Sequence, residues 1–194
     1  EWYAFYGKKY HFYLFCRKIP ILHTKITDNT AKLPTFIPNL PTIMVRKIEN
    51  IDQFNRYFNQ PSYHPLVSVA NLADANLSLF NPTDFGMYCV VLMDADFGQL
   101  TLRGATMTYQ AGTVFTMKPG HVVSMQLDAQ VHPKGWMLAF RPELIINTGL
   151  GRDFYMFNFF DYEVCDALNL YEGERHIMLN CFNTILSELR APDD

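Results

Sequence analysis

Residues 87–141 read MYCVVLMDADFGQLTLRGATMTYQAGTVFTMKPGHVVSMQLDAQVHPKGWMLAFR. Short apolar runs rich in β-branched, aromatic and Met side chains alternate here with clusters of Gly, Pro and Asp, which have turn chemistry. Regular short strands joined by tight turns are typical of a β-sandwich or β-barrel. Together with one run before this stretch, the predicted strands are 66–70, 87–93, 99–103, 105–110, 113–118, 121–127 and 136–140.

Helical patterns flank this β region. Ile51, Phe54 and Phe58 recur at helical spacing and predict a short helix before the strands. After Pro142 the period changes, and we expect a helical turn over 142–147, with Pro at its first position, and helices over 162–168 and 172–190. We therefore divide the chain into an N-terminal extension or linker (1–43), a β-barrel domain (44–142) and a helical tail (143–194).

The N-terminal extension has a composition of its own. Residues 1–18, EWYAFYGKKYHFYLFCRK, interleave aromatic and basic side chains, and the prolines that follow between 20 and 41 forbid a long helix there. The pattern is compatible with stacking on single-stranded nucleic acid, and also with an extension that packs on its own body or on a partner. Met44 resembles an ordinary translation start, and the composition changes near this residue.

The charge is distributed unevenly along the chain. Residues 1–48 carry eight Lys and Arg and two acids, whereas residues 49–194 carry eight Lys and Arg and seventeen acids, within a total net charge of −3. Affinity for phosphate backbones comes mainly from neutralising them with Lys and Arg. We therefore expect no specific binding of duplex DNA by residues 49–194.

Cysteine usage and hydropathy indicate an intracellular protein. Cys16, Cys89, Cys165 and Cys181 lie far apart without a C-x-x-C pair, which favours reduced thiols over a zinc knuckle or a disulfide framework. The most apolar N-terminal stretch, 10–16, is too short to span a bilayer and is followed directly by two basic residues. We expect a cytoplasmic protein that does not interact with a membrane.

No motif in the sequence indicates catalysis. The chain has no G-x-S-x-G elbow, the Gly-Leu-Gly at 149–151 lacks the third glycine of a dinucleotide loop, and the acids at 94 and 96 fall in a predicted turn. A cupin-type metal site needs an H-x-H motif, yet 86–100 contains no histidine, and His121 is displaced from its place in the second metal motif. We expect a protein that is not an enzyme and that holds no metal or cofactor.

A ligand site inside the β domain is predicted from alternating side chains. His121 ends an apolar row that includes Met125 on one strand face, and an aromatic and Met lining suits a largely apolar pocket. His121 is also compatible with a rim histidine satisfied by backbone or water. The same pattern would arise in a filled core. The candidate ligand-binding residues are Tyr88, His121, Met125, Trp136 and Leu138.

The predicted helix over 172–190 is strongly amphipathic. Met178, Phe182, Ile185 and Leu189 are spaced by 4, 3 and 4 residues, which is the seam spacing of paired helices. A helix packed only on its own domain is the alternative interpretation. We expect a homodimer that forms through these four residues, because the stripe continues to Leu189, where the β domain has the least left to cover it.

Several segments together resemble the N-terminal effector-binding and dimerisation domain of AraC-type bacterial transcription regulators. They match in order over about residues 45–190 and comprise the turn at 111–121, KGWMLAFRPELI at 134–145, LGR at 150–152, FFDYEV at 159–164 and LNLYEGER at 168–175. In one respect the sequence departs from the family pattern: Tyr171 stands where relatives carry a capping Ser or Thr, which should weaken the start of the last helix by about 1 kcal/mol.

The resemblance implies a fold and a function. The fold is a cupin-like double-stranded β-helix, or jelly-roll barrel, followed by α-helices, and the function is to sense a small-molecule effector and to dimerise. It also implies that DNA is read only through a C-terminal helix-turn-helix domain, which this chain lacks. Two alternatives remain open: a cupin-fold enzyme of the isomerase or dioxygenase type, and a dimerisation scaffold that takes no ligand.

Overall fold

A computed structural model describes residues 45–75, 82–95, 98–125, 133–146, 148–154, 160 and 167–191. The N-terminal extension (1–43) lies outside the described residues, and so do Met44 and most of the helix expected over 162–168. None of the helices in the described part is long and apolar enough to cross a membrane.

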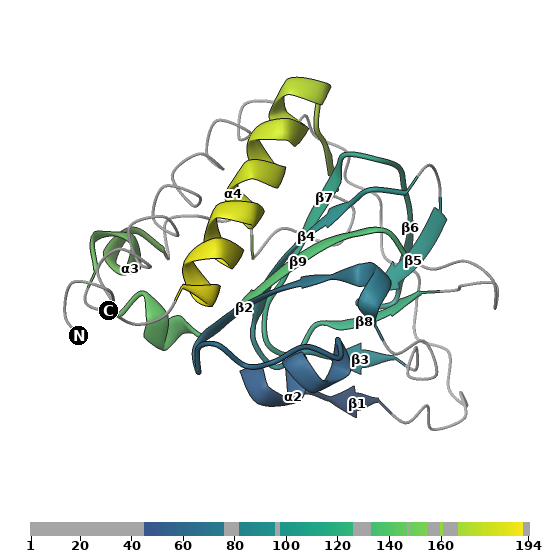
Figure 1. Cartoon of the computed structure of the whole chain (residues 1–194). Helices are drawn as coiled ribbons and strands as arrows, with labels where there is room; N and C mark the ends of the chain where they lie inside the picture. The colour runs from purple at the N-terminus through teal and green to yellow at the C-terminus, as the bar shows by residue number, and fades with distance from the viewer. Residues whose placement is uncertain are drawn as a thin grey trace.

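The β domain consists of two five-stranded sheets that pack face to face (Figure 1). Sheet A has the strand order β1-β3-β8-β5-β6, and sheet B has the order β10-β7-β4-β9-β2. The strands of sheet A are β1 (Arg46–Lys47), β3 (Thr83–Asp84), β5 (Gly98–Leu102), β6 (Ala105–Tyr109) and β8 (Val122–Met125). Those of sheet B are β2 (Val67–Asn71), β4 (Tyr88–Met93), β7 (Thr113–Met117), β9 (Gly135–Phe140) and β10 (Leu168–Asn169).

The antiparallel pairs of strands are nested within one another. The innermost pair is β5 with β6, and around it lie the pairs β4 with β7, β3 with β8, and β2 with β9. Successive strands from β2 to β5 and from β6 to β9 alternate between the two sheets. The connectivity is therefore that of one long hairpin, centred on the Arg103–Gly104 turn, that is rolled up so that its arms contribute to both sheets.

Two longer helices pack against the sheets. The α2 helix (Ile51–Tyr57) begins at Asn50, whose side chain accepts a hydrogen bond from the backbone N–H of Gln53 at 2.9 Å, as expected for a helix N-cap. The α4 helix (Glu172–Arg190) lies across the outer face of sheet B (Figure 1). Shorter helical pieces are η2 (Leu72–Asp74), η4 (Pro142–Leu144) and α3 (Gly149–Asp153).

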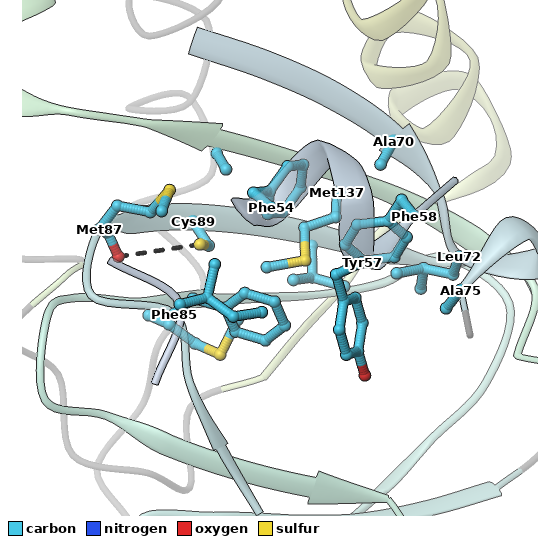
Figure 2. Close-up of a cluster of buried hydrophobic side chains, with 14 of the residues drawn as sticks. Phe54, Tyr57, Phe58, Ala70, Leu72, Ala75, Phe85, Met87, Cys89 and Met137 are labelled. Carbon is cyan, nitrogen blue, oxygen red and sulfur yellow. Dashed lines mark hydrogen bonds between the residues drawn. The ribbon is translucent and has the colours of Figure 1, made fainter. Parts of the chain in front are cut away.

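Sheet B is buried on both faces, so the molecule has two apolar clusters. The inner cluster fills the space between the sheets and includes Val91, together with Phe54, Met87 and Met137, which are labelled in Figure 2. The outer cluster lies between sheet B and the helices α3 and α4, and includes Leu138. Side chains on both faces of strands β4 and β9 are therefore packed against apolar partners: the odd-numbered residues in the inner cluster and the even-numbered residues in the outer cluster.

The predicted elements agree with the structure over most of the described chain. Each predicted strand coincides with an observed one to within a residue or two at its described end, and the helix expected over 172–190 is confirmed with the same bounds. The turn expected over 142–147 is a short 3₁₀ helix, η4. The helix expected over 162–168 is wrong at its end, because Leu168 pairs with Val114 as part of strand β10.

Candidate functional site

A cavity of about 50 Å³ lies between the two sheets. On the same measure one water needs roughly 10–15 Å³, so the cavity has room for a few water-sized groups or part of one small molecule. Strands of both sheets line it together with α2, η2 and Pro133. Its lining residues are Tyr57, Phe58, Leu72, Ala75, Thr83, Phe85, Val91, Met93, Phe115, Met117, Val123, Ser124, Met125, Pro133 and Met137.

The few polar side chains of the lining include Tyr57 and Thr83. Both are buried, with 7% of Tyr57 and 2% of Thr83 exposed, and their side chains are hydrogen-bonded to each other. Burial raises the pKa of Tyr57, and the positive charge of Arg46 and the Thr83 hydrogen bond oppose that rise. Figure 2 shows the Tyr57 hydroxyl directed away from its neighbours Phe58 and Leu72.

Arg46 brings a positive charge to this polar end of the cavity. It stands directly opposite Thr83 in the parallel pair formed by β1 and β3. Residues opposite each other on neighbouring strands have side chains on the same face of the sheet, so Arg46 and Thr83 share a face. Among the residues that the structure describes, no carboxylate forms a salt bridge with Arg46.

His121 directly precedes β8. Its side chain is buried, and its Nδ1 accepts a hydrogen bond from the backbone N–H of Lys118 at 3.4 Å. The turn that carries it is held by Asp84, whose Oδ1 accepts from the backbone N–H of Gly120 at 3.1 Å and of Gly86 at 2.8 Å. This arrangement favours the interpretation of His121 as a rim histidine satisfied by the backbone.

The structure separates the predicted ligand-binding residues. Met125 lines the cavity, whereas His121 is not among its lining residues. The expectation that Tyr88, Trp136 and Leu138 face the space between the sheets is wrong, because all three belong to the outer cluster beneath α4. The cause is that both faces of sheet B are buried. Odd-numbered and even-numbered residues of β4 and β9 are therefore both apolar, and the sequence does not show which set faces the space between the sheets.

Tyr88 packs in an aromatic group on that outer face. Its ring stacks on Phe140 with 5.6 Å between ring centroids, and meets Phe154 and Phe160 edge to face at 5.0 Å each. Such pairs add to the hydrophobic stabilisation of a core. Tyr88 is therefore part of the packing that joins sheet B to the helical tail.

Other cavity residues were not among the predicted site residues. Met93 shares strand β4 with Tyr88, and Met137 shares strand β9 with Trp136 and Leu138, in each case on the opposite face, while Tyr57 and Phe85 come from segments outside the main β stretch. One sequence signal was available: Met93, Met117, Met125 and Met137 put a flexible side chain on four of the predicted strands. Met fills irregular gaps and is common at adaptable binding surfaces.

The four residues predicted to form a dimer interface are covered by their own chain. Met178, Phe182, Ile185 and Leu189 are all 5% exposed or less and pack in the outer cluster against sheet B. The prediction of an interface on this stripe is therefore corrected in favour of a helix packed on its own domain. Sheet B presents an apolar outer face of its own along β2, β4 and β9, and the cluster formed by this face with η4 and α3 includes the stripe as far as Leu189. Dimerisation itself stays a prediction.

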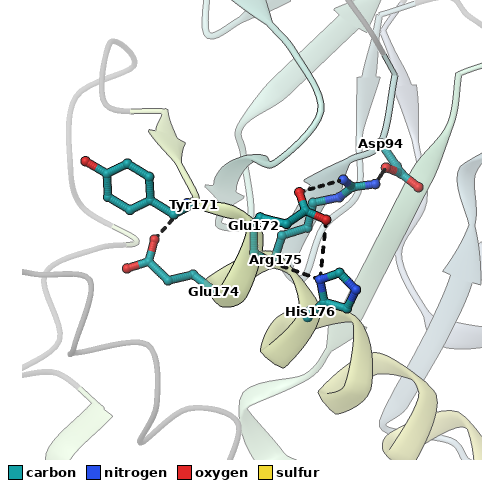
Figure 3. Close-up of polar contacts among 6 residues, drawn as sticks. All are labelled: Asp94, Tyr171, Glu172, Glu174, Arg175 and His176. Carbon is teal, nitrogen blue, oxygen red and sulfur yellow. Dashed lines mark hydrogen bonds and ion pairs between the residues drawn. The ribbon is translucent and has the colours of Figure 1, made fainter.

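The first turn of α4 is tied to the β domain by charges (Figure 3). Arg175 Nη2 forms an ion pair with Asp94 Oδ1, just after β4, and Arg175 Nη1 contacts Glu172 Oε2 at 3.4 Å. At the helix start, the backbone N–H of Tyr171 donates to Glu174 Oε2 at 2.9 Å. Glu174 thus satisfies one backbone group at the position where the side chain of Tyr171 provides no cap.

The structure also bears on thiol chemistry and on metal binding. The Cys89 thiol is fully buried, and burial, with a smaller contribution from Asp84, raises its pKa well above the usual value, so the thiol stays protonated and unreactive. Within the described residues, no three His, Cys, Asp or Glu side chains come close enough to hold a metal ion.

No family model matches the chain, and no curated protein matches it significantly. The structure shows a mainly β domain of two packed sheets with a C-terminal helix.

Proposed function

We propose that this chain is the ligand-sensing module of an AraC-type transcription regulator, with a jelly-roll fold and a cavity for a small-molecule effector. The ordered series of short motifs from residue 111 to residue 175 supports the family. The nested strand pairs from β2 to β9 support the jelly roll, because a rolled-up hairpin of eight strands is the connectivity of that fold.

The observation that carries the proposal is that the cavity and α4 share strands β4 and β9. Val91, Met93 and Met137 line the cavity from one face of these strands. Leu92 and Leu138, which alternate with them, belong to the cluster that contains α4. A ligand that displaces the first set moves the same backbone on which the second set packs.

In the proposed mechanism, the effector binds the arrangement of the two sheets that best fits it and so shifts the population towards that arrangement. Sheet B transmits the change to α4 through their common apolar cluster. The coupling is reciprocal, so a partner that binds one position of α4 alters the affinity of the cavity for its ligand. In regulators of this type the output is the placement of DNA-reading domains, and a homodimer would set their separation.

The lining indicates the character of the effector. Its side chains are chiefly aromatic, aliphatic and Met, with the hydroxyls of Tyr57 and Thr83 as polar groups among them. Each sugar hydroxyl needs a hydrogen-bond partner when it is buried, whereas an apolar body gains free energy from burial in such a lining. We therefore propose a small and mostly apolar effector rather than a sugar. The lining holds no His, Cys, Asp or Glu, the residues that a cupin enzyme uses to bind a catalytic metal.

A thermal-shift panel of small aromatic, aliphatic and sugar compounds, followed by hydrogen exchange on α4, tests the proposal. We expect an apolar compound to raise the unfolding temperature and to change exchange within residues 172–190. Val123→Phe, which fills the cavity, should abolish the shift, whereas Val122→Phe, on the opposite face of β8, should preserve it.

Two outcomes would contradict the proposal. A chain that no compound stabilises would be the ligand-free scaffold instead. A compound that still stabilises Val123→Phe as it does the parent would bind elsewhere.

A further inference from the structure

One end of the cavity differs from the rest in its chemistry. Most of the fifteen lining residues are apolar, yet Thr83 and Tyr57 form a buried, hydrogen-bonded pair of hydroxyls in the lining. Buried hydroxyls cost free energy unless they form hydrogen bonds. A pair that is hydrogen-bonded to each other still has acceptor or donor capacity to offer a ligand, since each hydroxyl has one donor and two acceptor sites.

Arg46 places a positive charge near these two hydroxyls. Its position opposite Thr83 in the β1–β3 register puts it on the same face of sheet A, and its charge acts on the Tyr57 phenol. Lys47, the next residue, stands opposite Asp84 and is exposed, so the two neighbouring basic side chains have different surroundings. Arg46 is only partly exposed, and a partly buried guanidinium attracts an anion more strongly than a fully solvated one.

We propose that the effector carries a carboxylate, or a similar small anion, which Arg46 and the Tyr57–Thr83 pair bind while its apolar body occupies the cavity. This inference rests on the function proposed above and names the class of ligand. Arg46 supplies the charge-assisted hydrogen bonds, which suit the planar, forked geometry of a carboxylate. Tyr57 and Thr83 set how far the head group enters.

Benzoate and benzamide are a matched pair of probes, because they share a ring and a planar head group but differ in charge. Titration calorimetry should show that the wild-type chain binds benzoate about tenfold or more tightly than benzamide, as expected for a charge-assisted hydrogen bond. Arg46→Gln should remove this preference and leave benzamide affinity unchanged. Lys47→Gln is the control, and it should retain the preference.

The outcomes separate this inference from the proposed function. If benzamide binds the wild type as tightly as benzoate, or if Arg46→Gln retains the preference, the anion site is refuted and the apolar cavity stands. If neither probe binds, the anion site is refuted, and the thermal-shift panel described above decides separately whether the cavity binds an uncharged apolar compound. Should Arg46→Gln not fold, the wild-type comparison still decides, and Tyr57→Phe provides the second variant: we expect it to weaken benzoate more than benzamide.

Discussion

Asn55 shows how one buried polar side chain holds an element in place. It is 1% exposed, and its Oδ1 accepts hydrogen bonds from Ser68 Oγ at 2.6 Å and from Gln60 Nε2 at 2.8 Å. Its Nδ2 donates to Ser62 Oγ at 2.9 Å. The network joins α2 to strand β2, and Tyr57 of α2 and the C-cap residue Phe58 both line the cavity.

We predict that Asn55→Ala destabilises the domain by about 1–3 kcal/mol, because it leaves buried partners without hydrogen bonds. Urea unfolding followed by circular dichroism measures the change. Asn183→Ala makes the same replacement at an exposed position of α4 and should stay within about 0.5 kcal/mol of the parent. If Asn55→Ala lowers the free energy of unfolding no more than Asn183→Ala does, the network contributes no stability.

Gly135 begins strand β9 in a backbone conformation that other residues avoid. Its φ is +146°, and a Cβ at this position would lie 2.2 Å from the backbone oxygen of Leu92 on the neighbouring strand. We predict that Gly135→Ala costs about 3 kcal/mol or more, since backbone cannot move aside as a flexible side chain can. Gly173→Ala, in α4 with open space around it, should instead be neutral or stabilise. A Gly135→Ala domain with the parent's unfolding midpoint would contradict the geometry.

The raised pKa of Tyr57 predicts a loss of stability in alkali. Burial, the largest cause, holds this pKa above its value in the unfolded chain, so between the two values the folded state retains a proton that the unfolded state releases. The contribution of Tyr57 to stability is therefore fully present below about pH 10 and is lost as the pH rises further. Tyr57→Phe should reduce this fall in urea titrations, whereas Tyr63→Phe, at an exposed tyrosine, should not. An identical pH dependence in Tyr57→Phe would exclude Tyr57 as the source.

At the scale of elements, the packing of α4 determines what its apolar stripe does. The stripe contributes to the same cluster as Leu138 and Phe140, so the helix is a structural part of the domain rather than a free seam. We predict that Leu189→Glu lowers stability by about 3 kcal/mol or more, because a charge would have to be buried. Ile177→Glu, on the exposed face of the same helix, should cost little.

Chemical unfolding and sedimentation of both variants measure these effects. If the parent is a dimer and Leu189→Glu is a monomer of equal stability, the dimer interface that the sequence predicted on this stripe would be supported after all. A dimer that is weakened by Ile177→Glu instead would point to the exposed face of the helix.

Strand β9 illustrates which features the sequence determines and which it leaves open. The run 136–140 and its flanking Pro133 and Gly135 predict the strand and its start, since apolar and β-forming residues follow turn residues. They do not predict which side chains face the cavity, because Trp136, Leu138 and Phe140 are as apolar as Met137 and Ala139. Which side chains of β9 face the cavity depends on α4, which comes from far along the chain and packs on the other face of sheet B.

On the scale of the whole molecule, the order of strands and helices could be predicted from local patterns, and the site could not. Turn residues such as those at 94, 104 and 112 mark the ends of strands, and the amphipathic period defines α4. The cavity combines residues of α2, β3, β4, β7, β8 and β9, whose proximity depends on how the hairpin rolls up. Arg46 is a further example, because β1 pairs with β3 across nearly forty positions of sequence.

The central claim is that a ligand between the sheets is detected by α4 through sheet B. Methyl NMR of the chain labelled at its methionines tests it directly, since Met93, Met117, Met125 and Met137 line the cavity and Met178 lies on the buried face of α4. On titration with benzoate and with benzamide, we predict that the four cavity methyls shift together and that Met178 shifts with the same affinity. Cavity methyls that stay in place while other signals respond, or a Met178 signal unchanged at saturation, would contradict the account.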